Sequence, residues 1–532
     1  MEELFWADKL ARQIIDRTSF HYSDKPLPQQ LVSVVKTSAS ISGVLHIGRL
    51  SDTIRGSTVH MALEAAGAPS ELIWVAEDMD PLRKIPKGVP ESYAQYLGMP
   101  VTSVPDPTGV FGSYAEAHKA EYLKVIDQFV FCRMKKYSMM EEYRKGHFRP
   151  YIKQLMENIG QIKGIQNAHR DEHLHADWSP WKPICAGCGK IATPRITHFD
   201  GTTVHYACED YAFEKTLAKG CGHKGIADPL KDEGKLLWKS EWAAQWAFWK
   251  VSAEGAGKEY QVPHSAWWVN AEICEHVLDF PMPEPIFYEH LMIDGKKMSA
   301  SLGNVVYPRQ WLEVATPEML RLLYNKRLMS SRSFAWKELP LLFEDFDKTQ
   351  AIAIGEKKLD NEKEVMHHKK LFSYSAPRLE KPLPMSFSHA IMLVQFYEKE
   401  DDMLASLQKT GHFDAGREEA LLLRLRQAKR WLEHFAPEEA RFKLQESADG
   451  AVLDEKQRQA IRILAKDLEA KEWDEHSLFQ RFYTICEEAG IANTEFFKGC
   501  YQVLLRRDRG PKLAPFLLVL GKERVLKLFS NV

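Results

Sequence analysis

A strand–helix–strand pattern near the beginning of the chain constrains the fold most strongly. Residues 31–35 form a short apolar run rich in valine, as is typical of a buried strand. Apolar side chains recur on one helical face over 46–66, and a second apolar run follows Gly67 at 71–76. Two strands joined through a helix form a parallel βαβ unit. We therefore expect a parallel α/β domain with its ligand site at the carboxyl ends of the strands.

The chain of 532 residues is too long for one hydrophobic core, and domains of about 100–200 residues predict three or four of them. From about 90 to 235 polar sequence interrupts the α/β rhythm, and helical periodicity dominates after about 310, most clearly at 389–407, 418–435, 455–470 and 494–505. The predicted segments are a first half of the α/β domain at 1–95, an insertion at 96–235, a second half at 236–310, a helical connector at 311–385 and a helical domain at 386–532.

Composition excludes several classes of protein. With 45% hydrophobic residues and 8 cysteines, the chain is neither disordered nor a disulfide scaffold. No apolar run reaches the roughly 18–20 residues that span a bilayer, and the first residues are acidic where a secretion signal is basic, so we expect no membrane partner. The cysteine usage predicts a reducing, cytoplasmic compartment. Because the net charge is only −2, an anionic partner has to meet local basic patches.

The loop after the first predicted strand leads directly into a helix. It contains neither a G-x-G-x-x-G fingerprint nor a P-loop lysine, so a dinucleotide site is not predicted. A helix N-terminus with unpaired N–H groups favours phosphate, His46 can donate to its oxygens, Gly48 admits a flat base, and Arg49 adds positive charge. A helix-starting loop with a surface histidine is an equally good interpretation of this segment taken alone.

A second loop, 294–304, follows a predicted strand about 250 residues later. It carries Lys296 and Lys297 and then two hydroxyls, Ser299 and Ser301. Such a loop can close its ammonium groups on a triphosphate as charge develops during displacement. A solvated basic turn would be the better interpretation of this loop alone. Two such loops at two strand ends together favour a nucleotide site.

This pair of loops resembles the two signature sequences of the class I aminoacyl-tRNA synthetases. They stand here as HIGR at 46–49 and KMSAS at 297–301. Within that family, further motifs across most of the chain look like those of the class I lysyl-tRNA synthetases. These motifs lie at 80–86, 234–238 with Trp242 and Trp246, 283–285 with 288–290, and 509–511 with 515–516.

The resemblance implies a Rossmann-type catalytic domain with a zinc-bearing, acceptor-binding insertion and an all-α C-terminal anticodon-binding region. The implied reaction activates L-lysine with ATP and Mg²⁺ to lysyl-adenylate plus pyrophosphate and then transfers lysine to the 3′ end of tRNA. Catalysis in this family rests on positioning and charge stabilisation, without a covalent enzyme intermediate. In this sequence His46, Gly48 and Arg49 would contact ATP, and Lys296, Lys297, Ser299 and Ser301 would hold the phosphates.

The implied lysine pocket combines small and aromatic residues, namely Ser38, Ser40, Trp238, Tyr260 and Tyr288. Aromatic faces attract an ammonium group by roughly 0.5–2 kcal/mol. A buried ammonium also needs a carboxylate, and four candidates remain open: Asp52, Asp78, Asp80 and Glu254. Trp242, Trp246 and Trp249 recur at helical spacing, so we expect them to pack in a core.

Four positions depart from the pattern of this family. Arg49 stands where relatives have Asn, Ala300 replaces the second signature lysine, Tyr260 replaces a usual His, and Ser38 replaces a usual Gly. These changes keep two alternatives open. One is a related amino-acid-activating enzyme with altered amino-acid or tRNA specificity, and the other is a non-catalytic tRNA-binding protein with the same fold.

The predicted insertion contains a cluster of metal-binding residue types. Two short segments with glycine turns supply five possible ligands for a structural zinc site that binds four. The spacing does not decide which four of Cys185, Cys188, Cys208, Cys221 and His223 would bind the metal. Free buried cysteines are the alternative. Relatives often carry another zinc cluster at the segment matching 105–118. Only Asp106 is a suitable ligand there, so we predict no second site.

The last 32 residues hold seven basic and two acidic side chains. A patch of this kind favours phosphate, although a solvated helix face is the better interpretation of the segment in isolation. Given the resemblance, this region would bind the tRNA anticodon, with aromatic side chains stacking on unpaired bases. We expect the protein to act as a monomer.

Overall fold

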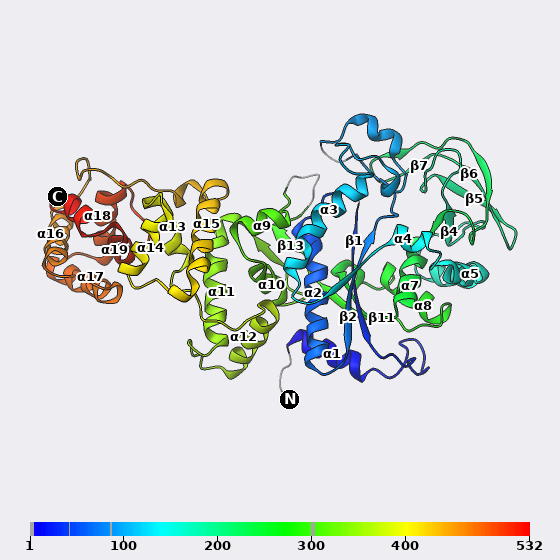
Figure 1. Ribbon diagram of the computed structural model, residues 1–532, viewed down its shortest axis with the longest axis horizontal. Coiled ribbons are helices and arrows are strands. Elements are labelled where there is room, and N and C mark those ends of the chain that lie inside the picture. Colours follow the sequence, from blue (N-terminus) through cyan, green and yellow to red (C-terminus); the bar gives the residue numbers. More distant parts are fainter. Residues whose placement is uncertain (1–4, 42, 86–87, 299–303) are drawn as a thin grey trace. The chain divides into compact units, whose positions relative to one another are not determined.

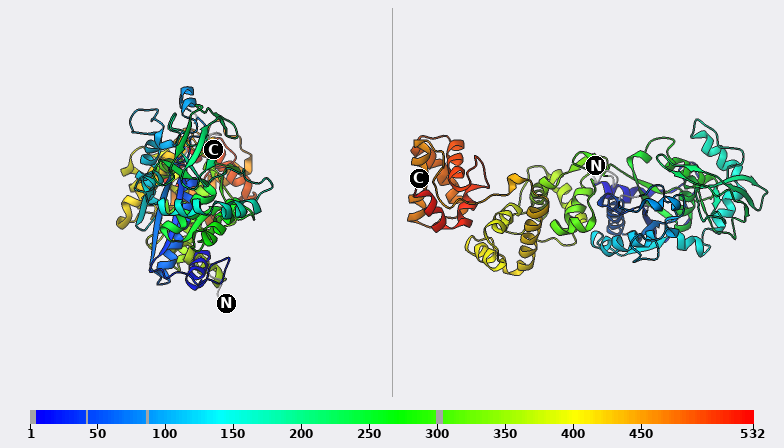
Figure 2. Two further views of the ribbon diagram at one scale, coloured as in Figure 1. Left: turned by 90° about the vertical axis from the view of Figure 1, so that its right-hand side faces the viewer. Right: turned by 90° about the horizontal axis from the view of Figure 1, so that it is seen from above.

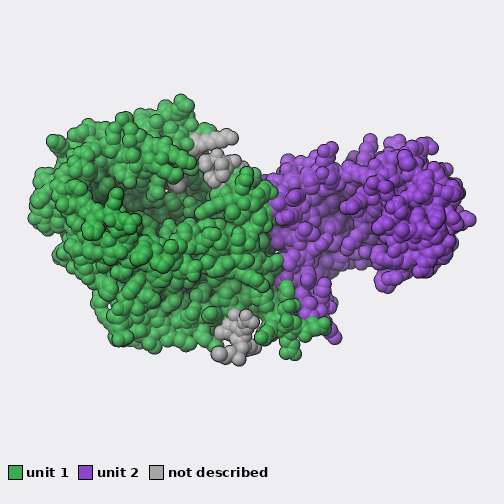
Figure 3. Space-filling model, turned by 180° about the vertical axis from the view of Figure 1, so that it is seen from behind, with its two compact units in different colours: residues 1–312, 316–334, 360–378 green, residues 313–315, 335–359, 379–532 purple. Residues whose placement is uncertain are grey.

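A computed structural model describes residues 5–41, 43–85, 88–298 and 304–532. The chain divides into two compact units (Figure 3). Unit 1 comprises 1–312, 316–334 and 360–378, and unit 2 comprises 313–315, 335–359 and 379–532. The α/β elements lie in unit 1 and the helical C-terminal region lies in unit 2.

A five-stranded parallel sheet forms the centre of unit 1. Its order is β12-β11-β1-β2-β3, so the chain builds outward from β1 in one direction and later in the other. This order places a topological switch between β1 and β11, where a Rossmann-type sheet opens a ligand crevice at the carboxyl ends of its strands. The strands are β1 (Ser33–Ser40), β2 (Ser70–Glu77), β3 (Met134–Ser138), β11 (Val251–Gly257) and β12 (Glu284–Tyr288).

The first strand is longer than its apolar run predicts. The run at 31–35 predicts only its beginning, whereas β1 continues to Ser40, which pairs with Glu77 of β2. Strand β2 pairs with β1 along its whole length, whereas β11 pairs with it only from Val34 to Lys36. Pairing with β2 therefore extends β1 through small and hydroxyl residues without an apolar pattern. Ser38 and Ser40 therefore lie in the strand and not in the loop that follows it.

Helix α2 (Ile47–Ala65) packs alongside β1 and β2, and matches the segment predicted at 46–66 (Figures 1 and 2). Most of its residues are buried, including hydroxyl side chains such as Thr53 and Ser57, since neighbours cover it on several sides. Helix α1 (Trp6–Asp16) and helix α10 (Pro317–Asn325) both contact it. The helix is consequently packed on several sides, with its first turn close to the carboxyl end of β1.

The segment predicted as an insertion, 96–235, contributes one strand to the central sheet. Strand β3 has the sequence MKKYS, whose two lysines concealed it from a search for apolar runs. In Figure 1, β4, β5 and β6 lie together near α5, apart from α1 and α2. The other elements of this segment are α3 (Tyr114–Ile126), α4 (Met139–Arg144), α5 (Arg149–Glu157), α6 (Ile159–Ala168), β4 (Trp181–Pro183), β5 (Pro194–Phe199), β6 (Val204–Cys208), β7 (Tyr211–Ala212), β8 (Leu217–Ala218), β9 (Lys224–Ala227) and β10 (Gly234–Leu236).

The second half of the α/β domain begins with α7 (Trp238–Trp249). Trp242, Trp246 and Trp249 are buried in the core of unit 1, as their spacing predicts. Strand β13 carries the second signature region into β14, and β15 completes a small sheet with them. The remaining elements of unit 1 are η4 (Lys258–Tyr260), α8 (Ala266–His276), β13 (Leu291–Ile293), β14 (Lys296–Lys297), β15 (Arg332–Phe334) and α12 (Glu362–Ser375), while α9 (Pro308–Val314) crosses between the units.

Unit 2 is helical, and its last helices share one apolar core. The amphipathic stretch at 389–407 forms two helices because Tyr397 and Lys399 adopt extended backbone angles between them. The helices are α11 (Leu339–Ala353), α13 (Phe387–Phe396), α14 (Glu400–Lys409), α15 (Glu418–His434), α16 (Glu455–Ala470), α17 (Glu475–Ala489), α18 (Asn493–Leu505), α19 (Leu513–Leu520) and α20 (Lys522–Phe529). Among the described residues, no helix combines the length and the apolar character that a bilayer crossing requires.

Candidate active site

The two signature loops meet at the first turn of α2. A Cβ atom added to Gly48 would lie 2.9 Å from Cε of Met298, so the second signature packs directly on the first. Two hydrogen bonds also hold Ile47 to segments that follow the second signature: Ile47 N donates to Val306 O at 2.8 Å, and Tyr324 Oη donates to Ile47 O at 2.9 Å. Segments about 250 residues apart in sequence thus form one edge of the crevice.

His46 caps α2 with its imidazole ring. Its Nδ1 accepts from Gly48 N at 3.2 Å, an assignment that leaves the proton on Nε2. Burial, together with the charge of Arg49, lowers the pKa of His46 to about 4, so the ring is neutral at pH 7. His46 therefore presents one N–H donor at the mouth of the helix.

The first N–H groups of α2 are already occupied, which corrects the expectation of an unpaired helix terminus. Ile47 N binds Val306 O, Gly48 N binds the His46 ring, and Arg49 N binds His46 O. A phosphate at this position would have to be bound by side chains. Arg49 is exposed and adds positive charge there.

Lys297 lies beside an acidic partner at the other signature. Its Nζ is 3.1 Å from Nε2 of His290 and 3.7 Å from Oε1 of Glu259, and Nε2 of His290 is 2.7 Å from Oε2 of Glu259. The side chain is 61% exposed, so it can leave this position when a stronger anion binds. Lys296 is also exposed in β14, while Ser299 and Ser301 lie outside the described residues.

Four of the predicted pocket residues have identified partners: two contact different aspartates, and two share a tryptophan neighbour. Ser40 Oγ donates to Asp80 at 3.2 Å, and Ser38 N donates to Asp52 at 2.9 Å. Two rings meet at a neighbouring tryptophan of α7: Trp238 stacks on Trp242 at 4.6 Å, and Tyr260 contacts Trp242 edge-on at 5.3 Å. Trp238 is the exposed end of this aromatic group.

Tyr288 already has a cation against its ring. The guanidinium carbon of Arg55 lies 4.6 Å from the ring centroid and 5.1 Å from that of Tyr324. Burial lowers the pKa of Arg55 to about 10, so it stays charged at neutral pH. Since Arg55 occupies one face of Tyr288, a lysine ammonium could use only the other face. Sequence analysis did not identify Arg55, because an arginine in a helix ordinarily indicates a surface position.

The four candidate carboxylates differ in how completely the protein satisfies their hydrogen bonds. Glu254 accepts from Lys36 Nζ at 2.6 Å and from the indoles of Trp242 and Trp246. Asp78 accepts from Lys119, Ser138 and the amide of Met140. Both are saturated by the protein itself.

Asp52 and Asp80 are not saturated by the protein itself. Among the described residues Oδ1 of Asp52 has no hydrogen-bond partner, and burial raises the pKa of Asp52 to about 7 against the opposing effect of the Ser38 amide. Burial favours neutral Asp80, but Lys235 at 2.9 Å outweighs it and holds the pKa of Asp80 below its usual value. The side chain of Asp80 is 20% exposed.

Close approach between α2 and β11 requires glycine at position 255. A Cβ atom there would lie 1.8 Å from Oδ1 of Asp52, much closer than any real contact. We expect Gly255→Ala to displace Asp52 from Ser38, to raise the KM for the amino-acid substrate, and to destabilise the fold by about 1–3 kcal/mol. Urea unfolding and steady-state kinetics measure the two effects.

Gly160→Ala is the matched control, because a Cβ atom on Gly160 of α6 meets nothing within 4 Å. Alanine in a helix is favoured over glycine by roughly 0.5–1 kcal/mol, so this variant should be as stable as the wild type or more stable. If Gly255→Ala had the same free energy of unfolding as Gly160→Ala and kept the wild-type KM, the close approach would matter neither for stability nor for substrate binding.

A buried charge network lies under these residues. We use this name for Lys36, Glu77, Asp80, Lys235, Glu241 and Glu254. Lys36 bridges Glu254 and Glu77, at 2.6 and 3.9 Å, and Lys235 bridges Asp80 and Glu241, both at 2.9 Å. Sequence analysis did not identify the two lysines as buried, because lysine is rarely buried without a partner and all the partners except Glu241 lie far away in sequence.

Four cysteines converge in the segment predicted to bind metal. The sulfur atoms of Cys185, Cys188, Cys208 and Cys221 all lie within 4.8 Å of one another, with 3.7 Å between Cys185 and Cys221 and 3.6 Å between Cys188 and Cys208. A tetrahedron with Zn–S bonds of about 2.3 Å has edges of about 3.8 Å, so the four thiols fit a zinc ion. His223, the fifth candidate, is not a member of this group.

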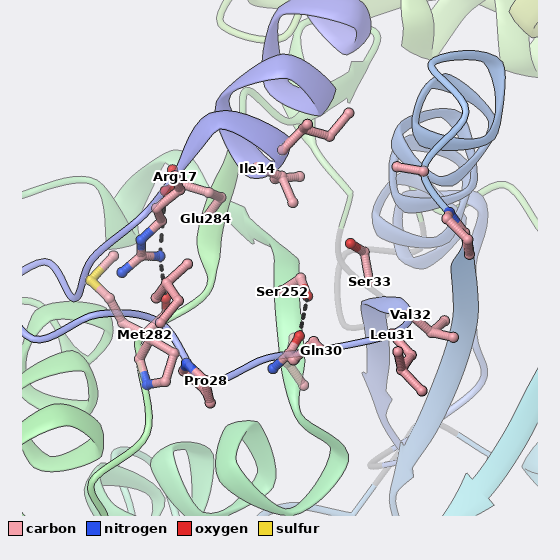
Figure 4. Close-up of a pocket in the computed structure, with 16 residues that line it drawn as sticks. Ile14, Arg17, Pro28, Gln30, Leu31, Val32, Ser33, Ser252, Met282 and Glu284 are labelled. Carbon is pink, nitrogen blue, oxygen red and sulfur yellow. Dashed lines mark hydrogen bonds and ion pairs between the residues drawn. The ribbon is translucent and has the colours of Figure 1, made fainter.

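A separate cavity lies at the opposite ends of the strands. It has a volume of about 320 Å³ and is lined by residues at the starts of β1, β11 and β12, including Ser33, Ser252 and Glu284 (Figure 4). Arg17 lies 3.4 Å from Glu284, and Ser252 Oγ donates to Gln30 at 3.1 Å. Ligands of parallel α/β sheets bind at the carboxyl ends, and no predicted site residue lines this cavity.

Comparison with known proteins identifies two matching families. Residues 4–378 match the family model described as tRNA synthetases class I (K), and residues 424–529 match an anticodon binding domain. The chain is 26% identical to the lysine–tRNA ligase of Methanosphaera stadtmanae and 30% identical to that of Pyrococcus furiosus, with 98% of each chain covered in both cases. A solved glutamate tRNA ligase from Elizabethkingia meningosepticum is 12% identical, with a TM-score of 0.42, over 94% of this chain and 99% of that chain.

Proposed function

We propose, since the chain belongs to the class I (K) family of tRNA synthetases, that it activates L-lysine with MgATP and transfers it to the 3′ end of a lysine-accepting tRNA. Relatives named lysine–tRNA ligase match nearly its whole length. The observation that carries the site assignment is the contact of Gly48 with Met298, because it joins both signatures around one crevice. Lysine–tRNA ligase is therefore the activity we assign.

In the first step the lysine carboxylate attacks the α-phosphorus of ATP and pyrophosphate leaves. His46 donates its Nε2 proton in a hydrogen bond to a phosphate oxygen, because its Nδ1 is engaged by Gly48. Lys297 moves from Glu259 to the phosphates of the leaving pyrophosphate. Lys296 and the hydroxyls of Ser299 and Ser301 bind the same phosphates. Positioned positive charge of this kind stabilises the transition state more than the ground state.

The substrate lysine carries two ammonium groups, and two candidate carboxylates remain available. Asp52 has an oxygen without a partner among the described residues, and Asp80 is partly exposed beside Ser40. We assign these two aspartates to the two ammonium groups. Trp238 and Tyr260 form the aromatic side of the pocket, and Tyr288 contributes the ring face that Arg55 leaves open.

The remaining partners follow from the domains. Unit 2 contains the matched anticodon binding domain and the basic C-terminal segment, so we assign it to the tRNA anticodon. Zinc would be held by Cys185, Cys188, Cys208 and Cys221, where it cross-links the insertion and supplies folding energy. We expect a cytoplasmic monomer.

Two assays test this function against its alternatives. L-lysine should support exchange of pyrophosphate into ATP, and the protein should then charge lysine tRNA. A non-catalytic tRNA-binding protein fails the exchange assay, whereas a paralogue with altered specificity passes it with another amino acid or fails only the charging step. Arg49 is the departure most relevant to the paralogue, because its exposed charge lies at the ATP end of the crevice. Exchange that runs best with glutamate would refute the pocket assignment.

A further inference from the structure

The buried charge network contains more acids than bases. Two lysines face four carboxylates, so the network carries an excess of negative charge if all six groups ionise. Lys36, Glu241 and Glu254 are at most 1% exposed, and Glu77 and Lys235 at most 8%. Arg83 approaches Asp80 only to 4.0 Å and is largely exposed. Water therefore screens the excess charge poorly.

The network touches the proposed lysine pocket at two points. Ser40 donates to Asp80, which is the most exposed member. Trp242, which contacts both Trp238 and Tyr260, donates its indole N–H to Glu254. The pocket therefore adjoins the network directly at Asp80 and through the Trp242 indole at Glu254, so the excess negative charge would attract a cation bound there.

Glu77 is the carboxylate of the network whose negative charge is least balanced by a nearby lysine. Lys36 is 3.9 Å away and bonds more closely to Glu254, and Gln245 donates to Glu77 from α7 at 3.1 Å. Among the described residues Oε1 of Glu77 has no hydrogen-bond partner. The titratable groups around it are Lys36 on β1, Asp80 after β2, Lys235 on β10, Glu241 on α7 and, further away, Tyr143 on α4 and Glu254 on β11.

We propose that this network selects a cationic substrate side chain, and that binding of the lysine ammonium releases a proton that Glu77 holds in the empty site. The inference rests on the proposed function and adds the determinant of substrate charge. A neutral or anionic side chain would leave the excess negative charge uncompensated, whereas an ammonium replaces the proton as the balancing charge. The carboxylic acid of Glu77 loses H⁺ to solvent, and no other bond changes.

The electrostatics of the network agree with this assignment. Burial raises the pKa of Glu77 to about 8, and the charges of Glu241 and Asp80 add to burial while those of Lys36 and Lys235 oppose it. Glu77 is therefore protonated at pH 7 before the substrate arrives. A nearby positive charge favours the ionised form, so lysine should bind more tightly as the pH rises towards 8.

Calorimetric titration of L-lysine into the full-length protein, in two buffers of different ionisation enthalpy at pH 7.0, counts the protons directly. We expect the wild type to release about half a proton to one proton per lysine bound. The lysine Kd should fall about three- to tenfold between pH 6.5 and 7.5, the range that linkage to one proton allows. Lysine binding without proton release would overturn the proposal.

Three variants locate the proton. Glu77→Gln should release none, and its Kd should be the same at both pH values and no lower than the wild-type Kd at pH 6.5, because glutamine resembles the protonated acid. Asp52→Asn tests the other carboxyl group whose pKa is raised. The proposal fails if Asp52→Asn no longer releases a proton on lysine binding while Glu77→Gln still does. Glu142→Gln is the matched control: Glu142 is a buried acid that pairs with Lys145 and His147, and its variant should release protons as the wild type does.

These outcomes are separable from failure of the proposed function. If L-lysine neither bound nor supported pyrophosphate exchange, the function itself would be wrong. If lysine bound and exchanged normally without proton release, only the role of the network would be wrong. The measurement on the wild type needs no substitution, so it decides the matter even if Glu77→Gln does not fold.

Discussion

Replacing Lys297 by alanine should lower kcat for lysine-dependent pyrophosphate exchange by about 10²–10³-fold, the range found when one preorganised charge-stabilising group is removed. The KM for ATP should change by less than about threefold, because Lys297 pairs with Glu259 and His290 and would engage the phosphates mainly as charge develops. Steady-state exchange kinetics with varied ATP measure both parameters.

Lys258→Ala is the matched control for this experiment. Lys258 is also exposed and pairs with a glutamate of a neighbouring segment, Glu289, at 2.9 Å. Its removal takes away one positive charge from the same region without touching either signature, so kcat should stay within about twofold, as for most exposed ion pairs. An unchanged kcat with a raised KM in Lys297→Ala would show that this lysine serves ground-state binding.

Cys208→Ser should abolish stoichiometric zinc binding. The Sγ of Cys208 is buried, lies 3.6 Å from Sγ of Cys188 and 3.2 Å from Oγ1 of Thr193, and a hydroxyl is a poor substitute for a thiolate ligand. Structural zinc contributes about 10–16 kcal/mol of apparent binding energy in small domains. We expect the metal content to fall from one per chain to near zero, and the insertion to become sensitive to protease.

Two further variants sharpen the zinc experiment. Cys132→Ser removes a cysteine that lies outside the thiol group and should leave the metal content at one per chain. His223→Ala should also retain zinc, since the four sulfur atoms complete a tetrahedron without it. Metal analysis after dialysis provides the readout. A Cys208→Ser protein that kept one zinc, or a wild type that bound none, would refute the four-thiol site.

Local sequence pattern was sufficient for the elements with an apolar face. The predicted segments 46–66 and 71–76 correspond to α2 (Ile47–Ala65) and β2 (Ser70–Glu77). Local sequence pattern was insufficient where strand pairing or backbone angles decide where a strand or helix ends. Strand β1 extends to Ser40 because β2 pairs with it as far as Glu77, and the stretch at 389–407 divides at Tyr397 and Lys399 although neither glycine nor proline occurs there.

The candidate site divides in the same way. The resemblance to the family signatures implied that the segments of His46 and Lys297 lie close together, and the structure brings these two segments into contact at Gly48 and Met298. Arg55, Lys36 and Lys235 were not identifiable from the sequence, since each is buried only through partners that are remote in sequence or supplied by another element. Sequence alone could not show that Glu254 is saturated by two indoles, nor that His223 lies outside the thiol group.

The close approach of Asp52 to Gly255 restricts how this enzyme can diverge. Any side chain at 255, or a longer acid at 52, would collide unless the other position changed at the same time. Randomising both codons in one library and selecting for growth should therefore recover compatible pairs, with few survivors that combine residues from different pairs. The two positions would evolve as a single unit, and drift at either one alone would be suppressed.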